Sequence, residues 1–460
     1  MRKSALRGVL AALAAVSVFA SVTAEGGAAS AEPTPPGAAV PVAISVSAAS
    51  SGHVGAGFAG FSYEKDRVGA GMFDAGDTNL VHLFRLLGPS VLRIGGNLVD
   101  IVNWNGAGTG GSSGEIAPAD VTKLAAFVRA TGWKVLYGIN LKTNTPANAA
   151  AEARFAAAAL GGSLLGFEVG NEPNFYRTES AYETSYNSYV AAIRAQVPGA
   201  VFDGPGQGDS TSWVSAFGAH EKNNALTDLS THLYIGKNTT ATIDGMLASN
   251  TSGRLPDAEA AMGKAQSADG IAQWRMTEAN SYYHGGAAGV SDVEAASLWS
   301  LEFLAGVAAH RGSGVNFHGG TSTQFPLAYS PIAFSGLMPT GVQGVYYGEL
   351  LWSLAGAGAL HAASVSGGSG VTAWAVGANV FVTNKGAEPI TATVTLPASA
   401  AAASEYVLTA PSLTSTAITI AGSGVGASGA FTPTPRPVAV SGTKVVVSVL
   451  ATSAALVVTR

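Results

Sequence analysis

The chain has 460 residues, of which 47% are hydrophobic and only 12% are charged, and its formal net charge is −5. This much apolar material supports a large packed core, so the composition excludes an intrinsically disordered protein. Binding to nucleic acid or to an anionic membrane requires clustered basic residues, and no such cluster follows Arg7. The chain has no cysteine, which excludes disulfides, thiolate catalysis and cysteine-based metal sites.

Residues 1–31 are expected to form a signal peptide. A few basic residues near the start precede the apolar segment Val9–Val22, which is too short to span a membrane comfortably. Small residues at the positions that signal peptidase requires predict cleavage after Ala24 or after Ala31. We therefore expect a secreted protein with no membrane attachment once the signal is removed; an uncleaved membrane anchor is the alternative.

Residues 51–357 are expected to form an α/β domain in which short apolar, β-rich runs alternate with helical stretches. The expected strands are Gly57–Glu64, Val91–Gly96, Lys134–Asn140, Leu164–Glu172, Val201–Gly206, Leu229–Gly236, Ala272–Asn280 and Gly314–Gly319. Eight such repeats predict a (β/α)8 TIM barrel, with an open doubly wound sheet as the alternative. Polar residues gather at the carboxyl ends of these strands, which meet at one mouth in a barrel, and this favours the barrel.

Two other segments flank this domain. Residues 32–50 are expected to form a linker and an N-terminal strand, and residues 358–460 alternate valine, threonine and alanine with turn residues. The second pattern predicts an all-β sandwich, an accessory domain for which we expect a structural role. Within the barrel, Ser291 and Glu294 are spaced as a capping box, which predicts that the last long barrel helix begins there.

Two glutamates at strand ends are candidate catalytic groups. Glu172 lies between Asn171 and Pro173 at the end of the fourth expected strand, and Glu278 ends the seventh. Strands four and seven face each other across an eight-stranded barrel, so the two carboxyl groups can meet, and glycoside hydrolysis requires such a pair. The amide of Asn171 can bond a sugar hydroxyl and the neighbouring carboxylate. The alternatives are a solvated Glu172 and an ion pair between Glu278 and Arg275.

Other polar residues lie near the same strand ends. Arg93 is expected either to orient the second glutamate or to form a core salt bridge, and Glu64 either to hold sugar hydroxyls or to pair with Arg93. His232 and Tyr234 end the sixth strand, where the tyrosine hydroxyl can tune the second glutamate, and His318 ends the eighth. No histidine pair has metal-ligand spacing, and the chain has no dinucleotide-binding or P-loop motif, so we expect no metal and no cofactor.

These motifs resemble glycoside hydrolase family 79, the β-glucuronidase and heparanase-like family of retaining (β/α)8 enzymes. The resemblance is carried by Gly60–Glu64, Leu92–Asn97, Val169–Asn174, Thr277–Tyr283, Phe317–Gly320 and Tyr329–Ile332. It implies that Glu172 is the acid/base and Glu278 the nucleophile, and that Glu64 and Asn171 hold ring hydroxyls. It also implies a C-terminal sandwich that is completed by the strand near Val42–Val46.

The same resemblance implies a site for the carboxylate of the sugar. Tyr283 and the backbone of Gly285 would bind it, assisted by Tyr329 and His318. No lysine or arginine lies between Arg275 and Arg311, so neutral donors would do this work. We therefore expect a retaining β-glucuronidase that acts on a glycan or glycoside. A retaining glycosidase for a neutral sugar and a non-catalytic glycan-binding barrel are the alternatives.

Overall fold

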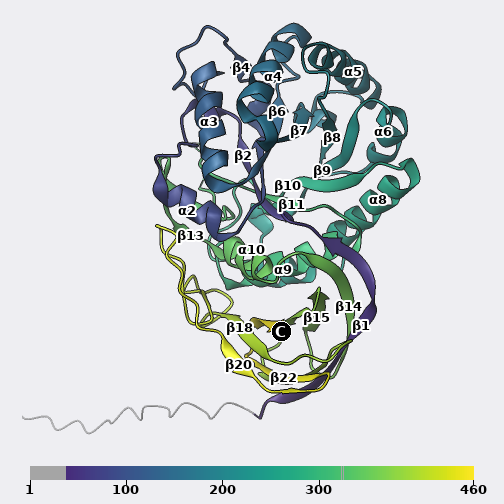
Figure 1. The fold of residues 1–460 in the computed structure, drawn as a ribbon, viewed down its shortest axis with the longest axis vertical. Helices are drawn as coiled ribbons and strands as arrows, with labels where there is room; N and C mark the ends of the chain where they lie inside the picture. The colour runs from purple at the N-terminus through teal and green to yellow at the C-terminus, as the bar shows by residue number, and fades with distance from the viewer. Residues whose placement is uncertain (1–37, 323, 325) are drawn as a thin grey trace, which may run out of the picture. The chain divides into compact units, whose positions relative to one another are not determined.

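The computed structural model of the protein describes residues 38–460 except 323 and 325, and the expected signal peptide lies outside these residues. Eight parallel strands close into a barrel, which confirms the predicted fold (Figure 1). In chain order, which is also their order around the barrel, they are β2 (Ala59–Glu64), β3 (Val91–Gly95), β6 (Lys134–Ile139), β7 (Leu164–Val169), β8 (Phe202–Gly208), β9 (Leu226–Lys237), β10 (Gln273–Tyr283) and β11 (Val315–Gly319).

Helices cover the outside of the barrel, so its strands are buried on both faces. Every residue of β3 and of β11 is buried, which explains why β3 is an apolar run that only Arg93 interrupts. The helices are α1 (Asp66–Gly69), α2 (Thr78–Leu86), α3 (Pro118–Thr131), α4 (Pro146–Leu160), α5 (Glu179–Gln196), α6 (Val214–Glu221), α7 (Ile243–Ala248), α8 (Arg254–Asp269), α9 (Glu294–Ala309) and α10 (Gly344–Leu354).

Short elements decorate the loops at both ends of the barrel. They are β4 (Asn103–Trp104), β5 (Glu115–Ile116), β12 (Ile332–Ser335), β13 (Met338–Val342) and the 3₁₀ turns η1 (Asn97–Asp100), η2 (Gly161–Ser163), η3 (Pro173–Phe175) and η4 (Asn238–Thr240). Across the described part of the chain, no helix is both long and apolar enough to cross a membrane.

Helix α9 is apolar on nearly all sides because it is covered on both faces, by the barrel and by the β domain (Figure 1). The capping box predicted at its start is wrong. Ser291 bonds instead to Ser281 and to the N–H of Ala287. The first N–H groups of α9 donate to the carbonyls of Ser415 and Leu413 of the β domain, at 3.0 and 3.1 Å, so distant chain segments satisfy the end of this helix.

The C-terminal residues and the N-terminal strand β1 together form the predicted all-β domain as one continuous sheet of eleven strands. They are β1 (Val40–Val54), β14 (Gly358–Ser366), β15 (Val371–Val376), β16 (Asn379–Asn384), β17 (Ile390–Thr395), β18 (Ala403–Thr409), β19 (Thr419–Ile420), β20 (Arg436–Val438), β21 (Val440–Ser441), β22 (Lys444–Val449) and β23 (Ser453–Thr459). Strand β1 lies between β14, its antiparallel neighbour, and β17, its parallel neighbour. The sheet curls so that β22 packs against β16 and β23 over a valine-rich core.

Candidate active site

A cavity of about 420 Å³ lies at the carboxyl ends of the barrel strands, the face on which (β/α)8 enzymes carry their active sites. Its wall includes Glu172 and Glu278 together with five other predicted site residues: Glu64, Tyr234, Tyr283, His318 and Tyr329. These side chains follow or end strands from β2 to β11. The barrel thus brings together residues that are far apart in the sequence.

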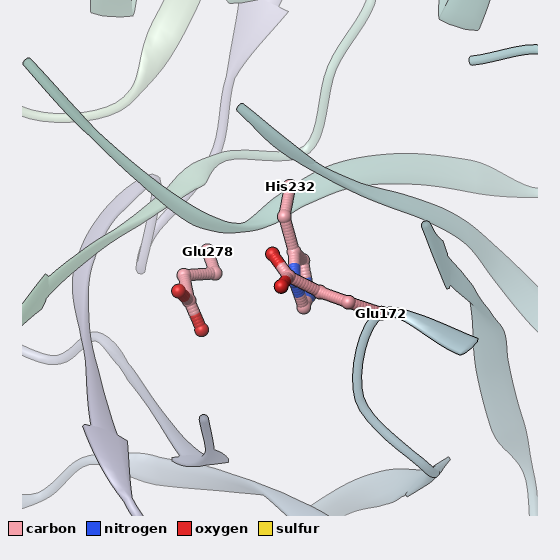
Figure 2. Close-up of side chains that lie close together, drawn as sticks. All are labelled: Glu172, His232 and Glu278. Atoms are coloured by element: carbon pink, nitrogen blue, oxygen red, sulfur yellow. The ribbon is translucent and has the colours of Figure 1, made fainter. Parts of the chain in front are cut away.

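The two candidate catalytic carboxyl groups face each other across this cavity. Oxygen atoms of Glu172 and Glu278 and a ring nitrogen of His232 all lie within 4.8 Å of one another. Figure 2 shows the two glutamates extending toward the same space, with the His232 ring beside the Glu172 carboxylate. Retaining glycosidases hold their carboxyl groups about 5–5.5 Å apart, whereas inverting enzymes leave room for a water between them. The spacing fits the retaining arrangement.

The chain holds Glu172 in an uncommon backbone conformation. Its φ is 47°, in the left-handed region, and its N–H donates to Gly206 O at 3.0 Å. Pro173 begins η3 directly after it, which turns the chain away from the strand direction. Gly208 makes room for the side chain, because a Cβ there would lie 2.6 Å from Cδ of Glu172. This local geometry aims the carboxyl group into the cavity.

Two donors bind the carboxylate of Glu278, and a histidine lies beside it. Arg93 Nη1 donates to Oε2 at 2.7 Å, Tyr234 OH donates to Oε1 at 2.8 Å, and His318 Nδ1 lies 3.5 Å from Oε2. Burial by itself raises the pKa of Glu278, but the positive charges of nearby histidines and of Arg93, with the Tyr234 hydrogen bond, outweigh it and lower that pKa. Because burial lowers the pKa of His318, Arg93 is the permanent charge in this group. Glu278 is therefore ionised, as a nucleophile must be.

Glu172 has the opposite environment. Burial raises its pKa, and the negative charge of Glu278 raises it further, while the contact of its Oε1 with Nδ1 of His232 at 3.3 Å opposes the change. A carboxyl group with a raised pKa keeps its proton at higher pH and can donate it. The two glutamates therefore differ as an acid and a nucleophile must.

Arg93 connects the carboxyl group of Glu278 to the interior of the barrel. Its Nε donates to Glu168 at 2.7 Å and its Nη2 donates to Oδ1 of Asn171 at 2.8 Å. Both roles proposed for Arg93 are thus present, because it orients Glu278 and also forms a core salt bridge with Glu168. Arg275 is engaged elsewhere, with Asn316 and with carbonyl groups at the base of the barrel, and does not pair with Glu278.

A second carboxyl pair lies beneath the site. Glu168 and Asp203 are register partners on β7 and β8 and are both buried. Burial and the charge of Glu168 raise the pKa of Asp203 well above its ordinary value. Burial acts on Glu168 as well, but the charge of Arg93 outweighs it and lowers the pKa of Glu168. The pair therefore shares one proton, and its remaining negative charge pairs with Arg93.

Glu64 does not form the ion pair with Arg93 that was one of its two expected roles. Its Oε2 accepts the N–H of Leu98 at 2.7 Å, and its Oε1 lies 3.9 Å from Nε2 of His318. Gly96 leaves room for this carboxyl group, because a Cβ there would overlap it. Burial and the nearby charge of Glu278 raise the pKa of Glu64 to about 8, so at neutral pH it is a protonated acid that faces the cavity.

The structure separates the residues that were expected to bind substrate into two groups. Tyr283 and Tyr329 line the cavity, and Asn280 fixes Tyr329 by donating to its carbonyl at 3.0 Å. Gly285 does not line the cavity; its carbonyl accepts the N–H of Tyr329 at 3.1 Å. Asn171 is buried, with its amide bonded to Arg93 and to Oδ1 of Asn97 at 3.3 Å. In this state Gly285 and Asn171 support the site from behind its wall.

The sequence did not predict several cavity residues: Arg67, Leu98, Phe175 and Asp209. Arg67 lies three residues after Glu64, so its position just past a strand end was a usable signal. Asp209 follows β8 and has a φ of 54°, a left-handed conformation that no sequence pattern predicted.

The three side chains in Figure 2 are also the group of described residues best arranged to hold a metal ion. Two features weigh against that use. Both oxygens of Glu278 already accept hydrogen bonds, from Arg93 and Tyr234, and the Arg93 charge would repel a cation. The expectation of no metal stays a prediction, which chelation can test.

No protein-family model matches the chain, and no curated protein matches its sequence. Its structure is similar to that of a 4-O-α-L-rhamnosyl-β-D-glucuronidase from Fusarium oxysporum 12S, with a TM-score of 0.75 and 20% identity over 90% of this chain and 99% of that one. It is also similar to a family 51 α-L-arabinofuranosidase from Bifidobacterium longum (TM-score 0.67, 16% identity, 91% and 99% covered) and to one from Xanthomonas axonopodis pv. citri (0.68, 16%, 92% and 100%).

At these identities the comparisons establish the fold. The chain has the architecture of the (β/α)8-barrel glycoside hydrolases, in which a second, all-β domain accompanies the barrel.

Proposed function

We propose that the protein is a retaining glycoside hydrolase. The observation that carries this proposal is the pair of carboxyl groups, Glu172 and Glu278, that meet within 4.8 Å in environments that shift their pKa values in opposite directions. Within this class we propose a β-glucuronidase of the family 79 type, which removes β-glucuronic acid from a glycan or glycoside.

The proposed mechanism has two displacements. Glu278 attacks the anomeric carbon and forms a glycosyl ester, while Glu172 gives its proton to the departing oxygen. Once Glu278 is esterified its negative charge is gone, and the pKa of Glu172 falls because that charge was one of the causes of its increase. Glu172 then takes a proton from water, which attacks the ester and releases the sugar. Arg93 and Tyr234 bind Glu278 throughout and stabilise the carboxylate as leaving group.

Three observations support glucuronate as the sugar. The motifs around both glutamates resemble family 79. The similar Fusarium structure is that of a rhamnosyl-glucuronidase. Tyr283 and Tyr329, to which the resemblance assigns the sugar carboxylate, line the same cavity as the catalytic pair.

The proposal can be tested with aryl glycosides. Glu278→Gln should abolish hydrolysis of 4-nitrophenyl β-glucuronide, whereas Glu172→Ala should retain some turnover of this good leaving group. Azide should increase the turnover of Glu172→Ala, because it attacks the glycosyl ester in place of water, needs no base and forms the glycosyl azide. Glu388→Gln, on the exposed surface of the β domain, is the matched control. Full activity of both site variants would disprove the assignment. Faster hydrolysis of the β-glucoside than of the β-glucuronide would support a retaining glycoside hydrolase but would show that glucuronate is not its preferred sugar.

Secretion is part of the same proposal, because residues 1–31 carry the basic start, the apolar segment and the small residues of a signal peptide. Export of the full chain with a leader removed after Ala24 or Ala31 should give a mature protein that begins at Glu25 or Glu32. The intact mass of the exported protein distinguishes these outcomes from retention of the leader.

A further inference from the structure

A second cavity of about 510 Å³ adjoins the candidate active-site cavity. The two cavities share Arg67, Thr321 and Leu327 as wall residues. The rest of the second cavity comes mainly from the segment between β11 and α10, including Ala333 and Phe334, with Asp292 from the loop after β10. Its volume is within the range of about 300–1,000 Å³ that small-molecule sites occupy.

The position of the second cavity on the barrel indicates which part of a substrate enters it. Glu172, which protonates the leaving group, follows β7. In the order of strands around the barrel, β7 lies four strands from β11 and three from β2, which is the opposite side of the mouth. Arg67 and Thr321 follow β2 and β11. The second cavity therefore extends the glycone side of the site, away from the leaving group.

The electrostatics of this junction favour an anion. Arg67 is the one lysine or arginine among the described residues that line either cavity. Its side chain is 13% exposed, its Nε lies 3.3 Å from Oδ1 of Asp66, and this Nε has no hydrogen-bond partner among the described residues. Burial raises the pKa of Asp66, the acid beside it, and the charge of Arg67 opposes that change.

Two other acidic side chains near Arg67 have partners, but only Asp209 is paired with a positive charge. Asp209 pairs with Arg254 at 3.1 Å, and Asp292 accepts the N–H of Gly289 at 2.7 Å. Glu64, with its pKa raised to about 8, is uncharged at neutral pH. The guanidinium of Arg67 is thus the cation that a ligand at the junction would meet, and its geometry suits carboxylate or sulfate groups.

We propose that the second cavity binds an acidic substituent on the glycone, and that Arg67 contacts its negative charge. The substituent is a further uronic acid residue or a sulfate ester, carried on a hydroxyl remote from the scissile bond. This inference rests on the proposed function, because it assumes that the sugar lies between Glu172 and Glu278. It extends the substrate from an unsubstituted terminal sugar to an acidic, substituted one.

The test compares 4-nitrophenyl β-glucuronides that share the leaving group and differ only at O3 or O4. The arms carry no substituent, a neutral hexose, a uronic acid residue or a sulfate ester. In the wild-type protein, kcat/KM should be at least about tenfold higher for one of the acidic arms than for the neutral hexose arm, mainly through KM. Arg67→Gln should remove this preference, and Arg67→Lys should retain part of it. The uronate and sulfate arms identify the source of the charge.

Three results would overturn the inference. The first is a wild-type protein with no preference for an acidic arm, and the second is an equal decrease in kcat/KM on all arms in Arg67→Gln. The third is a decrease in Arg67→Gln that depends on the carboxylate of the glucuronide itself and is already present without a substituent. Arg85→Gln, an exposed arginine on α2, is the matched control, and melting temperatures check that the variants fold. If no arm is hydrolysed, the proposed function fails. Calorimetric binding of the free acidic disaccharide to wild type and Arg67→Gln then tests the second cavity independently of catalysis.

Discussion

Arg93 donates to Glu278 at 2.7 Å from one edge of its guanidinium and to Glu168 at 2.7 Å from the other. All three side chains are buried, so one positive charge serves two carboxylates in a region with little water. The ion pair that stabilises the barrel interior is therefore the same one that keeps the nucleophile ionised.

Replacing Arg93 should affect both pH dependence and stability. Arg93→Met removes a charge that lowers the pKa of Glu278, so the acidic limb of the kcat/KM profile should move to higher pH. It also leaves two buried carboxyl groups unpaired, which should cost about 3–5 kcal/mol of unfolding free energy. Arg93→Lys keeps the charge and should move the limb less. An unshifted limb in Arg93→Met would mean that other groups keep Glu278 ionised.

Tyr234→Phe isolates the hydrogen bond of 2.8 Å to Oε1 of Glu278. A hydrogen bond to a charged group contributes about 1.5–3 kcal/mol, so kcat/KM should fall roughly 10- to 150-fold while the melting temperature changes little. Tyr189→Phe is the matched control, because that buried hydroxyl donates to Asn144 O at 2.8 Å, away from the cavity. Equal losses in the two variants would point to a general packing defect.

Gly208→Ala should displace the acid/base without removing it. The added Cβ would lie 2.6 Å from Cδ of Glu172 and 2.7 Å from a ring carbon of Phe175, so the carboxyl group must move. We expect a loss of kcat that is larger for poor leaving groups, which need the proton, than for 4-nitrophenol. Gly162→Ala meets no atom within 4 Å and serves as the control. A loss that is independent of the leaving group would contradict this prediction.

Glu349 on α10 should make the protein less stable as the pH rises. Both of its carboxyl oxygens are buried without a hydrogen-bond partner among the described residues, and burial raises its pKa in the folded state well above the ordinary value. The folded protein therefore binds this proton more tightly than the unfolded chain does. The stability that this tighter proton binding contributes is fully present below the unfolded pKa of about 4.3. It is lost as the pH rises through the folded pKa of Glu349.

Glu349→Gln keeps a neutral side chain of similar size at every pH. The melting temperature of this variant should decrease less than that of the wild type between pH 5 and pH 8, the range that calorimetry should cover. Parallel curves for the two proteins would show that Glu349 is not responsible for the pH dependence.

Chelation tests the expectation that catalysis needs no metal. Dialysis against EDTA should leave kcat and KM unchanged, because Arg93 and Tyr234 already occupy the oxygens of Glu278. Loss of activity that Zn²⁺ or Mn²⁺ restores would instead assign Glu172, His232 and Glu278 as ligands.

The sequence by itself determined the order of strands and helices and the two glutamates near the carboxyl ends of strands four and seven. The strand ends differ from those expected: β7 ends at Val169, three residues before Glu172, and β10 continues past Glu278 to Tyr283. Local signals carry the order, because most buried parallel strands are apolar runs and Pro173 begins a turn directly after Glu172. The strand count then predicted that both carboxyl groups lie at one mouth, since parallel strands in a closed barrel all end on the same side.

Only the tertiary structure decided how each group is charged and which partner it has. The pKa of Glu64 depends on burial and on Glu278, more than two hundred residues later in the chain, and the start of α9 is satisfied by carbonyls of the β domain. Arg67 became a candidate ligand contact because two cavities meet at its side chain. Such properties arise from desolvation and from contacts across the fold, and neither is encoded in the local pattern of residues.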